Sequence, residues 1–168
     1  MNNPHWRWYA WSQLDPDTLY AFLKLRSDIF VVEQNCVFSD MDGIDARCTH
    51  LCGRDSHGRL LAYLRLVPPG VERPAHITEG TRANASDGPA LGRLVVDAAA
   101  RNRGLARAAV QEGLRRCAHD YAGQPVYLSA QQHLEPLYAS LGFVGISPAY
   151  LEDGIWHVDM RRPADAPG

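Results

Sequence analysis

The segment Leu91–Arg107, LGRLVVDAAARNRGLAR, constrains the fold more than any other part of the chain. Its apolar run Leu94–Val96 predicts a strand, and Arg101–Ala106 follows a short turn and opens a helix. The first turn of a helix has unpaired backbone N–H groups and a partial positive charge, so anions bind there. Small residues at Gly104 and Ala106 let a ligand approach the backbone. The segment therefore predicts a strand–turn–helix unit that binds an anion, with a diphosphate as the best match.

Size and charge limit the classes of protein that this chain can belong to. At 168 residues and a formal net charge of −2, we expect one domain over 1–168, with its core over 6–160 and a frayed tail over 161–168. The charge argues against nucleic acid as a main partner. No stretch of about 18 apolar residues predicts a membrane helix. The N-terminus lacks the basic and apolar regions of a signal peptide, so we expect a cytoplasmic protein without membrane association.

The four cysteines, Cys36, Cys48, Cys52 and Cys117, are expected to be free thiols. Cys48 and Cys52 stand four apart with His50 between them, which raises the question of a zinc site. A zinc site needs a second pair of ligands at suitable spacing, and the sequence offers none. We therefore expect no bound metal.

Hydrophobic periodicity and turn signals predict alternating helices and strands. Helices are predicted over 16–30, 103–121 and 133–141, and strands over 49–53, 60–67, 91–96, 125–130, 143–150 and 155–160. A Pro- and Gly-rich loop is predicted over 68–89. Trp6, Trp8 and Trp11 recur at about strand spacing and are expected to cover one face of a sheet. The order predicts an α/β protein with one mixed sheet and helices on its faces.

Two motifs resemble those of the Gcn5-related N-acetyltransferase (GNAT) superfamily. Arg101-x-x-Gly104-x-Ala106, after an apolar strand, is similar to its acetyl-CoA motif, and Tyr138-x-x-x-Gly142-Phe143 is similar to its Tyr-x-x-x-Gly-Phe element. Ala106 stands where glycine is common in that superfamily.

Further short sequence motifs resemble those of the ElaA-like branch of the superfamily, and the resemblance covers about residues 6–160. They are Leu25-Arg26-Ser27, Phe30-Val31-Val32-Glu33-Gln34, Asp40-x-Asp42, Thr49-His50-Leu51, Ala62-Tyr63-x-Arg65-Leu66, Gly92-Arg93, Ser129-Ala130-Gln131 and Glu152-Asp153-Gly154-Ile155-x-His157. The loop 71–89 looks long for this branch.

The resemblance implies the GNAT fold, a twisted mixed sheet of about six to seven strands whose two central parallel strands splay apart and hold the thioester between them. It implies acetyl-CoA as co-substrate. The implied cofactor-binding residues are Leu94, Val95, Val96, Arg101, Asn102, Arg103, Gly104, Leu105, Ala106, Arg107 and Gln131. Backbone groups of the strand would pair with the pantetheine amides, and N–H groups of the helix start would face the diphosphate.

Tyr138 and Glu33 are the candidate catalytic residues. A phenol has a reference pKa of about 10 and can donate a proton to the departing CoA thiolate; the alternative for Tyr138 is a core aromatic. Glu33 follows an apolar run and is expected to act through water as the base for the amine. The alternative is an ion pair with Arg26 or Arg65.

The substrate-side candidates are Arg26, Phe30, Gln34, His50, Arg65, Asp153 and His157. Arg26 lies on the apolar side of its helix, so we expect it to be paired with Glu33 or Asp42. His50 and His157 have a structural alternative as histidines on strand faces.

These features predict an acyl-CoA-dependent N-acyltransferase that transfers acetyl from acetyl-CoA to a primary amine by direct attack. The expected partner is a small-molecule or peptide amine. The sequence leaves open whether the protein forms a homodimer. One alternative is a non-catalytic CoA-binding module on the same fold. Another is a metal-dependent hydrolase built on His50, His133 and His157, which is disfavoured because their spacing matches no metal motif.

Overall fold

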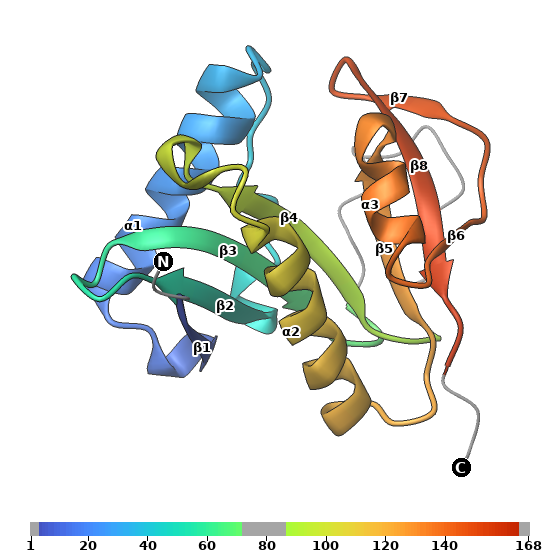
Figure 1. The fold of residues 1–168 in the computed structure, drawn as a ribbon, viewed down its shortest axis with the longest axis horizontal. Helices are drawn as coiled ribbons and strands as arrows, with labels where there is room; N and C mark the ends of the chain where they lie inside the picture. The colour runs from blue at the N-terminus through green and yellow to red at the C-terminus, as the bar shows by residue number, and fades with distance from the viewer. Residues whose placement is uncertain (1–3, 72–86, 165–168) are drawn as a thin grey trace.

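The computed structural model describes residues 4–71 and 87–164. Their strands form one mixed sheet in the order β1-β2-β3-β4-β5-β8-β6, with β7 paired to β8 (Figure 1). The strands are β1 His5–Ala10, β2 Thr49–Arg54, β3 Leu60–Val67, β4 Ala90–Val96, β5 Val126–Gln131, β6 Val144–Gly145, β7 Tyr150–Glu152 and β8 Ile155–Arg162. The main helices are α1 Pro16–Arg26, α2 Leu105–Asp120 and α3 Glu135–Ala139. The predicted fold class is confirmed.

Helix α1 begins where its capping signal predicts. The Asp15 carboxylate accepts a hydrogen bond from the Thr18 N–H at 2.8 Å, and Pro16 occupies the first turn. The helical path continues beyond the predicted end at residue 30, because a π-helical segment, Ser27–Glu33, extends it. This extension brings the end of the helix to the functional site described below.

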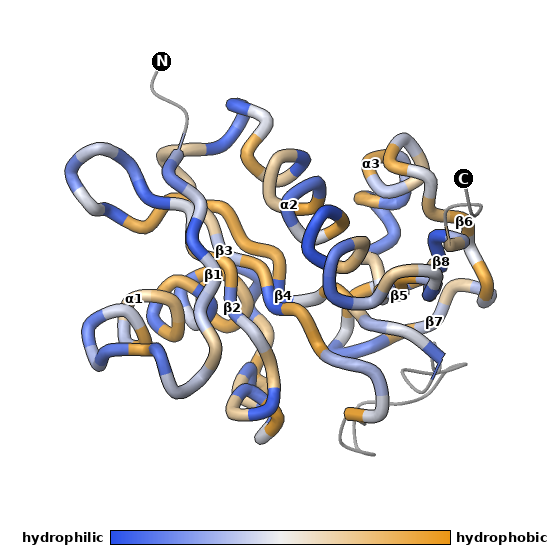
Figure 2. The backbone as a smooth tube through the Cα atoms, turned by 90° about the horizontal axis from the view of Figure 1, so that it is seen from below, coloured by the Kyte–Doolittle hydropathy of each residue, from blue (hydrophilic) through white to orange (hydrophobic). Residues whose placement is uncertain are grey.

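Helices α1 and α2 cover opposite faces of the sheet. Alternate residues of β3 point to each: Leu64 belongs to the cluster that packs against α2, and Tyr63 to the cluster that packs against α1. Gly113 of α2 lies so close to the sheet that a Cβ there would be 2.7 Å from Leu64. The central strands are mostly hydrophobic, with a hydrophilic stretch, whereas α2 presents more hydrophilic residues (Figure 2).

Two predictions about regular structure need correction. Trp6 and Trp8 pack against the cluster under α2, but Trp11 belongs to a short 3₁₀ turn and its ring lies 6.0 Å from that of His50 on the other face. The predicted strand 143–150 is two short strands, β6 and β7, because Pro148 between them has no N–H for a ladder.

The ends of the predicted segments also differ in places. Helix 133–141 is a 3₁₀ turn followed by α3, and β8 reaches Arg162, two residues into the predicted tail. The predictions for the loop 68–89 and the tail fall mainly on 72–86 and 165–168, which lie outside the described residues.

Strands β4 and β5 splay apart, as the resemblance implies. Their parallel pairing is limited to Ala90 and Tyr127, with a hydrogen bond of 3.0 Å from Tyr127 N–H to Pro89 O. A bulge in β4 adds to the divergence: its register against β3 shifts between Val95 and Gly92, and Arg93 has a φ of 51°. Beyond the single pair, the β5-facing edge of β4 has no strand partner among residues 4–71 and 87–164.

Candidate active site

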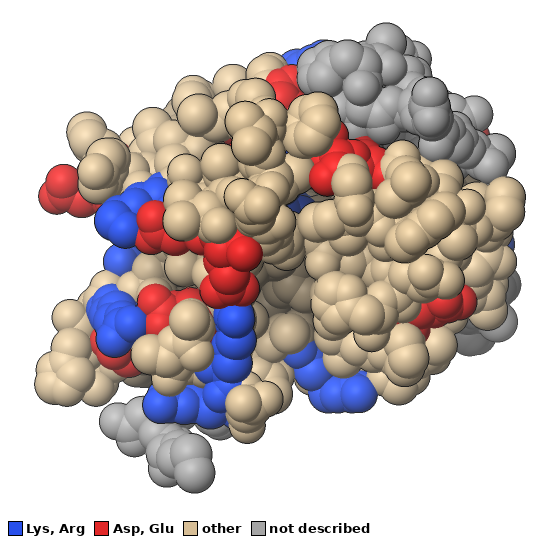
Figure 3. Space-filling view, turned by 90° about the horizontal axis from the view of Figure 1, so that it is seen from above, with Lys and Arg blue, Asp and Glu red and all other residues tan. Residues whose placement is uncertain are grey.

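A cavity of about 930 Å³ opens where β4 and β5 diverge. Its walls come from β4, β5, the start of α2, α3, the π-helical end of α1, and the β7–β8 hairpin. The hollow between the two halves of the molecule is visible on the surface, with charged side chains gathered mainly along one side (Figure 3). The cavity therefore joins the predicted anion site to the gap between the strands.

The turn before α2 has the conformation that the sequence predicts for an anion site. Gly104 is the N-cap with a φ of 73°, and Asn102 has a φ of 60°. Glycine adopts the left-handed backbone conformation at a lower conformational energy than other residues. The first N–H groups of α2 have no partner within the helix and are available to a ligand.

Nine of the eleven predicted cofactor-binding residues line the cavity. Leu94, Val95 and Val96 do so from β4, and Gln131 from β5. Arg101, Asn102, Gly104, Leu105 and Ala106 do so from the turn and α2. The exceptions are Arg103 and Arg107: Arg103 donates to Ala99 O at 3.4 Å, and Arg107 donates to Ser140 Oγ at 2.8 Å. Arg103 therefore contacts the segment before the turn, and Arg107 links the first turn of α2 to the end of α3.

Tyr138 lines the same cavity from α3. Its side chain is 7% exposed and meets Phe143 edge to face, with ring centroids 6.0 Å apart. Burial raises the pKa of Tyr138 to about 12. Within 4–71 and 87–164, no hydrogen bond to its hydroxyl is formed, and that hydroxyl is not sealed from solvent. Tyr138 is therefore a protonated phenol that can donate to a group in the cavity.

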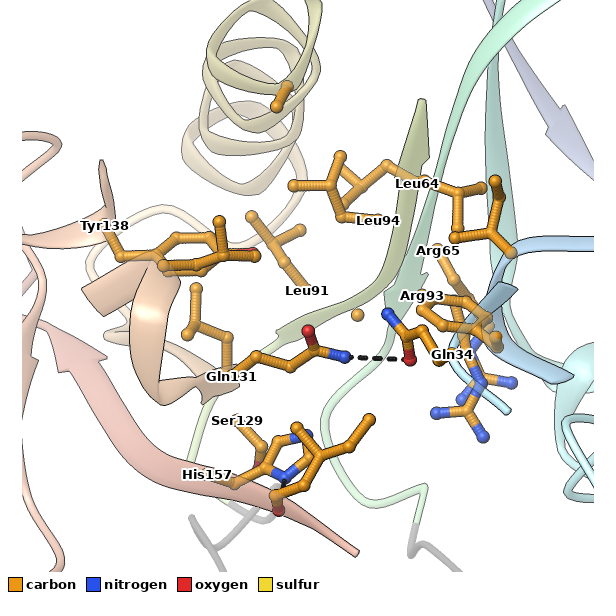
Figure 4. Close-up of a pocket in the computed structure, with 18 of the residues that line it drawn as sticks. Gln34, Leu64, Arg65, Leu91, Arg93, Leu94, Ser129, Gln131, Tyr138 and His157 are labelled. Atoms are coloured by element: carbon orange, nitrogen blue, oxygen red, sulfur yellow. Dashed lines mark hydrogen bonds between the residues drawn. The ribbon is translucent and has the colours of Figure 1, made fainter. Parts of the chain in front are cut away.

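A hydrogen bond crosses the cavity between its two sides. Gln131 Nε2, at the end of β5, donates to Gln34 Oε1 at 3.2 Å (Figure 4). In this view Tyr138 lies on one side of that bond, and Ser129 and His157 lie on the other. The bond marks the boundary between the Tyr138 side and the β5–β8 wall.

Glu33 lines the cavity but does not have either of the ion-pair partners named from the sequence. Both of its oxygens accept from Arg101, at 2.7 and 2.9 Å, and the side chains of Glu33 and Arg101 are 42% and 41% exposed. The pair links the end of the π-helical segment that follows α1 to the turn 101–104 before α2, here called the anion turn. A pairing with Arg26 or Arg65 is wrong, because both are occupied elsewhere.

Three arginines and three aspartates form a buried network beside the cavity. Arg26 pairs with Asp40 at 2.7 Å and with Asp45 at 2.9 Å. Arg65 pairs with Asp42 at 2.6 Å and with Asp45 at 2.8 Å.

Arg93, at the β4 bulge, completes the network. Its Nε lies 2.8 Å from Asp40 Oδ1, and its Nη2 lies 3.4 Å from Asp42 Oδ2. The charges balance, and they tie α1, the 40–45 segment, β3 and β4 together.

The network places the substrate-side candidates in two groups. Phe30, Gln34, Arg65, Asp153 and His157 line the cavity. Arg26 and His50 are each 0% exposed and lie behind its wall. Arg26 is paired, as its apolar surroundings predict, but with Asp40 and Asp45 instead of Glu33 or Asp42.

His50 is held neutral by its surroundings. Its Nε2 donates to Asp45 O at 3.0 Å, so its Nδ1 accepts from the Tyr63 hydroxyl at 2.7 Å. Burial lowers the pKa of His50 to about 4, and the nearby Arg26 and Arg65 act in the same direction. His50 is thus a structural histidine in a sealed position.

The His50 pKa predicts a loss of stability in mild acid. Below about pH 6.5, His50 becomes protonated in the unfolded state but stays neutral in the folded state. The free energy of unfolding therefore declines from about pH 6.5 to about pH 4. The expected contribution is about 3 kcal/mol. Urea unfolding at pH 7 and pH 4.5 measures it, and His50→Gln should lose less stability between these pH values than the wild type. Equal losses would show that His50 does not carry the effect.

The β5–β8 wall contains a polar cluster that sequence reasoning missed. Asp159 of β8 lines the cavity and is 2% exposed. It accepts from Tyr150 Oη at 2.5 Å and from Ser129 Oγ at 2.7 Å. The available signal was an acidic residue between the apolar Val158 and Met160 of a strand, where an acid is rarely buried without a partner.

The cysteines and histidines form no metal site in the part of the chain that the structure describes. All four cysteines are unpaired, and Cys48, Cys52 and Cys117 are buried. No group of three or more His, Cys, Asp or Glu side chains there is arranged to hold a metal ion. In the same residues, no helix is long and apolar enough to cross a membrane.

Known proteins share both the sequence and the fold of this chain. A model of the acetyltransferase (GNAT) domain matches residues 77–163. A UPF0039 protein of Schizosaccharomyces pombe is 36% identical over 162 residues, with 96% of this chain and 98% of that protein covered. The chain belongs to the GNAT acetyltransferase family.

Other GNAT relatives confirm the resemblance to the ElaA-like branch. Protein ElaA of Escherichia coli is 34% identical over 163 residues, covering 94% of this chain and 95% of that protein. A crystal structure described as an acyl-CoA N-acyltransferase from Pseudomonas aeruginosa has a TM-score of 0.82 at 37% identity, covering 95% of this chain and 99% of that one. The family supports an acyltransferase that uses acyl-CoA, and the relatives' names leave the acceptor open.

Proposed function

We propose that this protein transfers an acetyl group from acetyl-CoA to a primary amine by direct attack. The observation that carries the proposal is the continuous cavity, which runs from the start of α2, through the opening between β4 and β5, to Tyr138. Each part offers the chemistry that one part of the reaction needs. Bound acetyl-CoA supplies the activated thioester.

The residues present fit the two polar parts of that co-substrate. The N–H groups at the start of α2, after Gly104, suit a diphosphate, because they are unpaired and lie at the positive end of the helix. The edge of β4 beyond Ala90, which pairs with no other described strand on that side, suits the pantetheine amides, since it offers backbone groups for an added strand.

Tyr138 serves as the proton donor to the departing sulfur. Its buried hydroxyl stays protonated at neutral pH, and it opens on the cavity. A covalent cysteine intermediate fits poorly. Cys36 lines the cavity, but burial raises its pKa and therefore disfavours the thiolate that would be the nucleophile.

Two assays test the proposal. Acetyl-CoA should raise the melting temperature of the protein, and release of free thiol from acetyl-CoA should require both the protein and an amine. A panel of acyl-CoAs of increasing length then gives the acyl preference. A thermal shift with no amine-dependent thiol release across the amine panel would favour the non-catalytic CoA-binding alternative.

Glu33 is a candidate base from the sequence, but its bidentate pair with Arg101 favours a role in positioning the anion turn. Glu33→Gln is expected to raise the KM for acetyl-CoA about two- to fivefold, the range for loss of an exposed ion pair, with the pH–rate profile unchanged. Arg101→Gln should raise the same KM. Loss of the acidic limb of the profile in Glu33→Gln would instead establish Glu33 as the base.

A further inference from the structure

The β5–β8 wall has one polar face turned to the cavity. Ser129 and Asp159 are direct partners in the β5–β8 ladder, and their neighbours Val158 and Met160 point the other way, into the core. Only 2% of the surface of Asp159 is exposed, and this residue lines the cavity. A carboxylate in this position must be stabilised by donors.

Among the described residues, the two donors to the Asp159 carboxylate are hydroxyl groups, and both reach the same oxygen. Tyr150 Oη and Ser129 Oγ donate to Oδ1 at 2.5 and 2.7 Å. A carboxylate only accepts and a hydroxyl has a single proton, so both protons are directed at Asp159. Burial and the hydrogen bond to Asp159 raise the pKa of Tyr150, so its phenol keeps that proton.

The second oxygen of Asp159 extends this pattern. Between residues 4–71 and 87–164, no side chain or backbone group donates to Oδ2, and that oxygen is not sealed from solvent. It is a charged acceptor on a nearly buried residue of the cavity wall. An N–H donor from a ligand would give it the partner that a buried carboxylate requires.

His157 lies beside this group, next to a second carboxylate, that of Glu152. Its Nδ1 lies 2.8 Å from the backbone oxygen of Ile155, which can only accept, so the proton is on Nδ1. His157 Nε2 lies 4.0 Å from Glu152 Oε2. Ser129 and His157 lie together on one side of the Gln34–Gln131 bond (Figure 4). The wall as a whole offers acceptors and negative charge.

We propose that this wall binds the acceptor as a primary ammonium, through the open Oδ2 of Asp159. A primary ammonium has N–H donors and a positive charge, which match the open oxygen of a nearly buried carboxylate. The Asp159 carboxylate repels a carboxylate on the substrate. The proposal rests on the proposed function and narrows the acceptor to cationic amines that have no carboxylate next to the amine.

Substrate preference gives the first test. The probes are n-butylamine and the matched pair alaninamide and alanine, which differ in the carboxylate. Alaninamide is expected to have a kcat/KM at least about tenfold above that of alanine, because the carboxylate of alanine lies beside the Asp159 carboxylate when its amine is bound there. Alanine as the better acceptor would overturn the proposal.

Asp159→Asn gives the second test, because it removes the charge and can turn a donor toward the cavity. The KM for n-butylamine should rise at least about tenfold, as expected for a charge-assisted hydrogen bond in a desolvated site, while the dissociation constant for CoA stays unchanged. Asp120→Asn, at the far end of α2, is the matched control. Tyr150→Phe keeps the carboxylate and should raise the same KM less.

Calorimetric titration of n-butylamine separates this proposal from the proposed function. Wild-type protein should bind the amine more tightly than Asp159→Asn, whether or not acetyl transfer occurs. Binding without transfer would support the ammonium site and contradict the enzyme. Transfer with equal KM values in correctly folded wild type and Asp159→Asn would retain the enzyme and remove the ammonium site. No amine binding by the wild type would also overturn it.

Discussion

Replacement of Tyr138 by phenylalanine is expected to lower kcat at least about 100-fold, the low end for loss of a general acid. The variant retains the ring that packs against Phe143, so the fold should be kept. It removes only the hydroxyl that opens on the cavity. Because burial raises the Tyr138 pKa to about 12, this hydroxyl keeps its proton at neutral pH until the thiolate develops.

The dissociation constant for CoA separates catalysis from binding in this variant. It should remain within about twofold of the wild type, because the diphosphate is bound by the α2 turn and not by Tyr138. Tyr121→Phe is the matched control: Tyr121 packs at the edge of the same core cluster, outside the cavity lining. Wild-type turnover in Tyr138→Phe would remove this residue from the mechanism.

The parts of the fold that the sequence predicts well are those set by local chemistry. The Asp15 cap and Pro16 define the start of α1, and the run LLAYLRLV gives the bounds of β3 without error. The anion turn follows from Gly104 and the helix behind it, since the left-handed φ and the free N–H groups are properties of a few adjacent residues.

The parts that sequence reasoning missed depend on contacts between distant segments. Ser129 and Asp159 meet only through the β5–β8 register, 30 residues apart in sequence. Glu33 and Arg101 are 68 residues apart, and their pairing depends on how the π-helical end of α1 lies against the α2 turn. Residue type predicts that such charges will be paired, but only the tertiary structure selects the partner.

Loss of Arg65 is expected to be the most destabilising single change in the charge network. Arg65→Met should lower the free energy of unfolding by about 3–5 kcal/mol, because it leaves buried carboxylates without their main partner. The side chains of Arg65 and Asp42 are 2% and 0% exposed, and two bonds of 2.8 and 2.6 Å join them. Asp45 would lose a partner at 2.8 Å as well.

The pH dependence of this loss identifies its cause. The arginines hold the pKa values of Asp42 and Asp45 below the ordinary carboxyl value, so these pairs stabilise the fold above about pH 4, and their contribution is lost as the pH falls through the folded values. The difference between wild type and Arg65→Met should therefore be largest at neutral pH. It should shrink in acid, where the carboxylates take up protons.

A double-mutant cycle and an exposed control complete the test. Asp42→Asn combined with Arg65→Met should destabilise less than the sum of the single changes, because the second change removes the unpaired charge. Arg59→Met, which breaks an exposed pair of 2.7 Å with Asp97, should cost at most about 1 kcal/mol. Equal losses in Arg65→Met and Arg59→Met, measured by urea unfolding at pH 7, would show that the network contributes no more than a surface ion pair. A larger loss in Arg65→Met would mean that the β4 bulge beside the cavity depends on buried charges for its position.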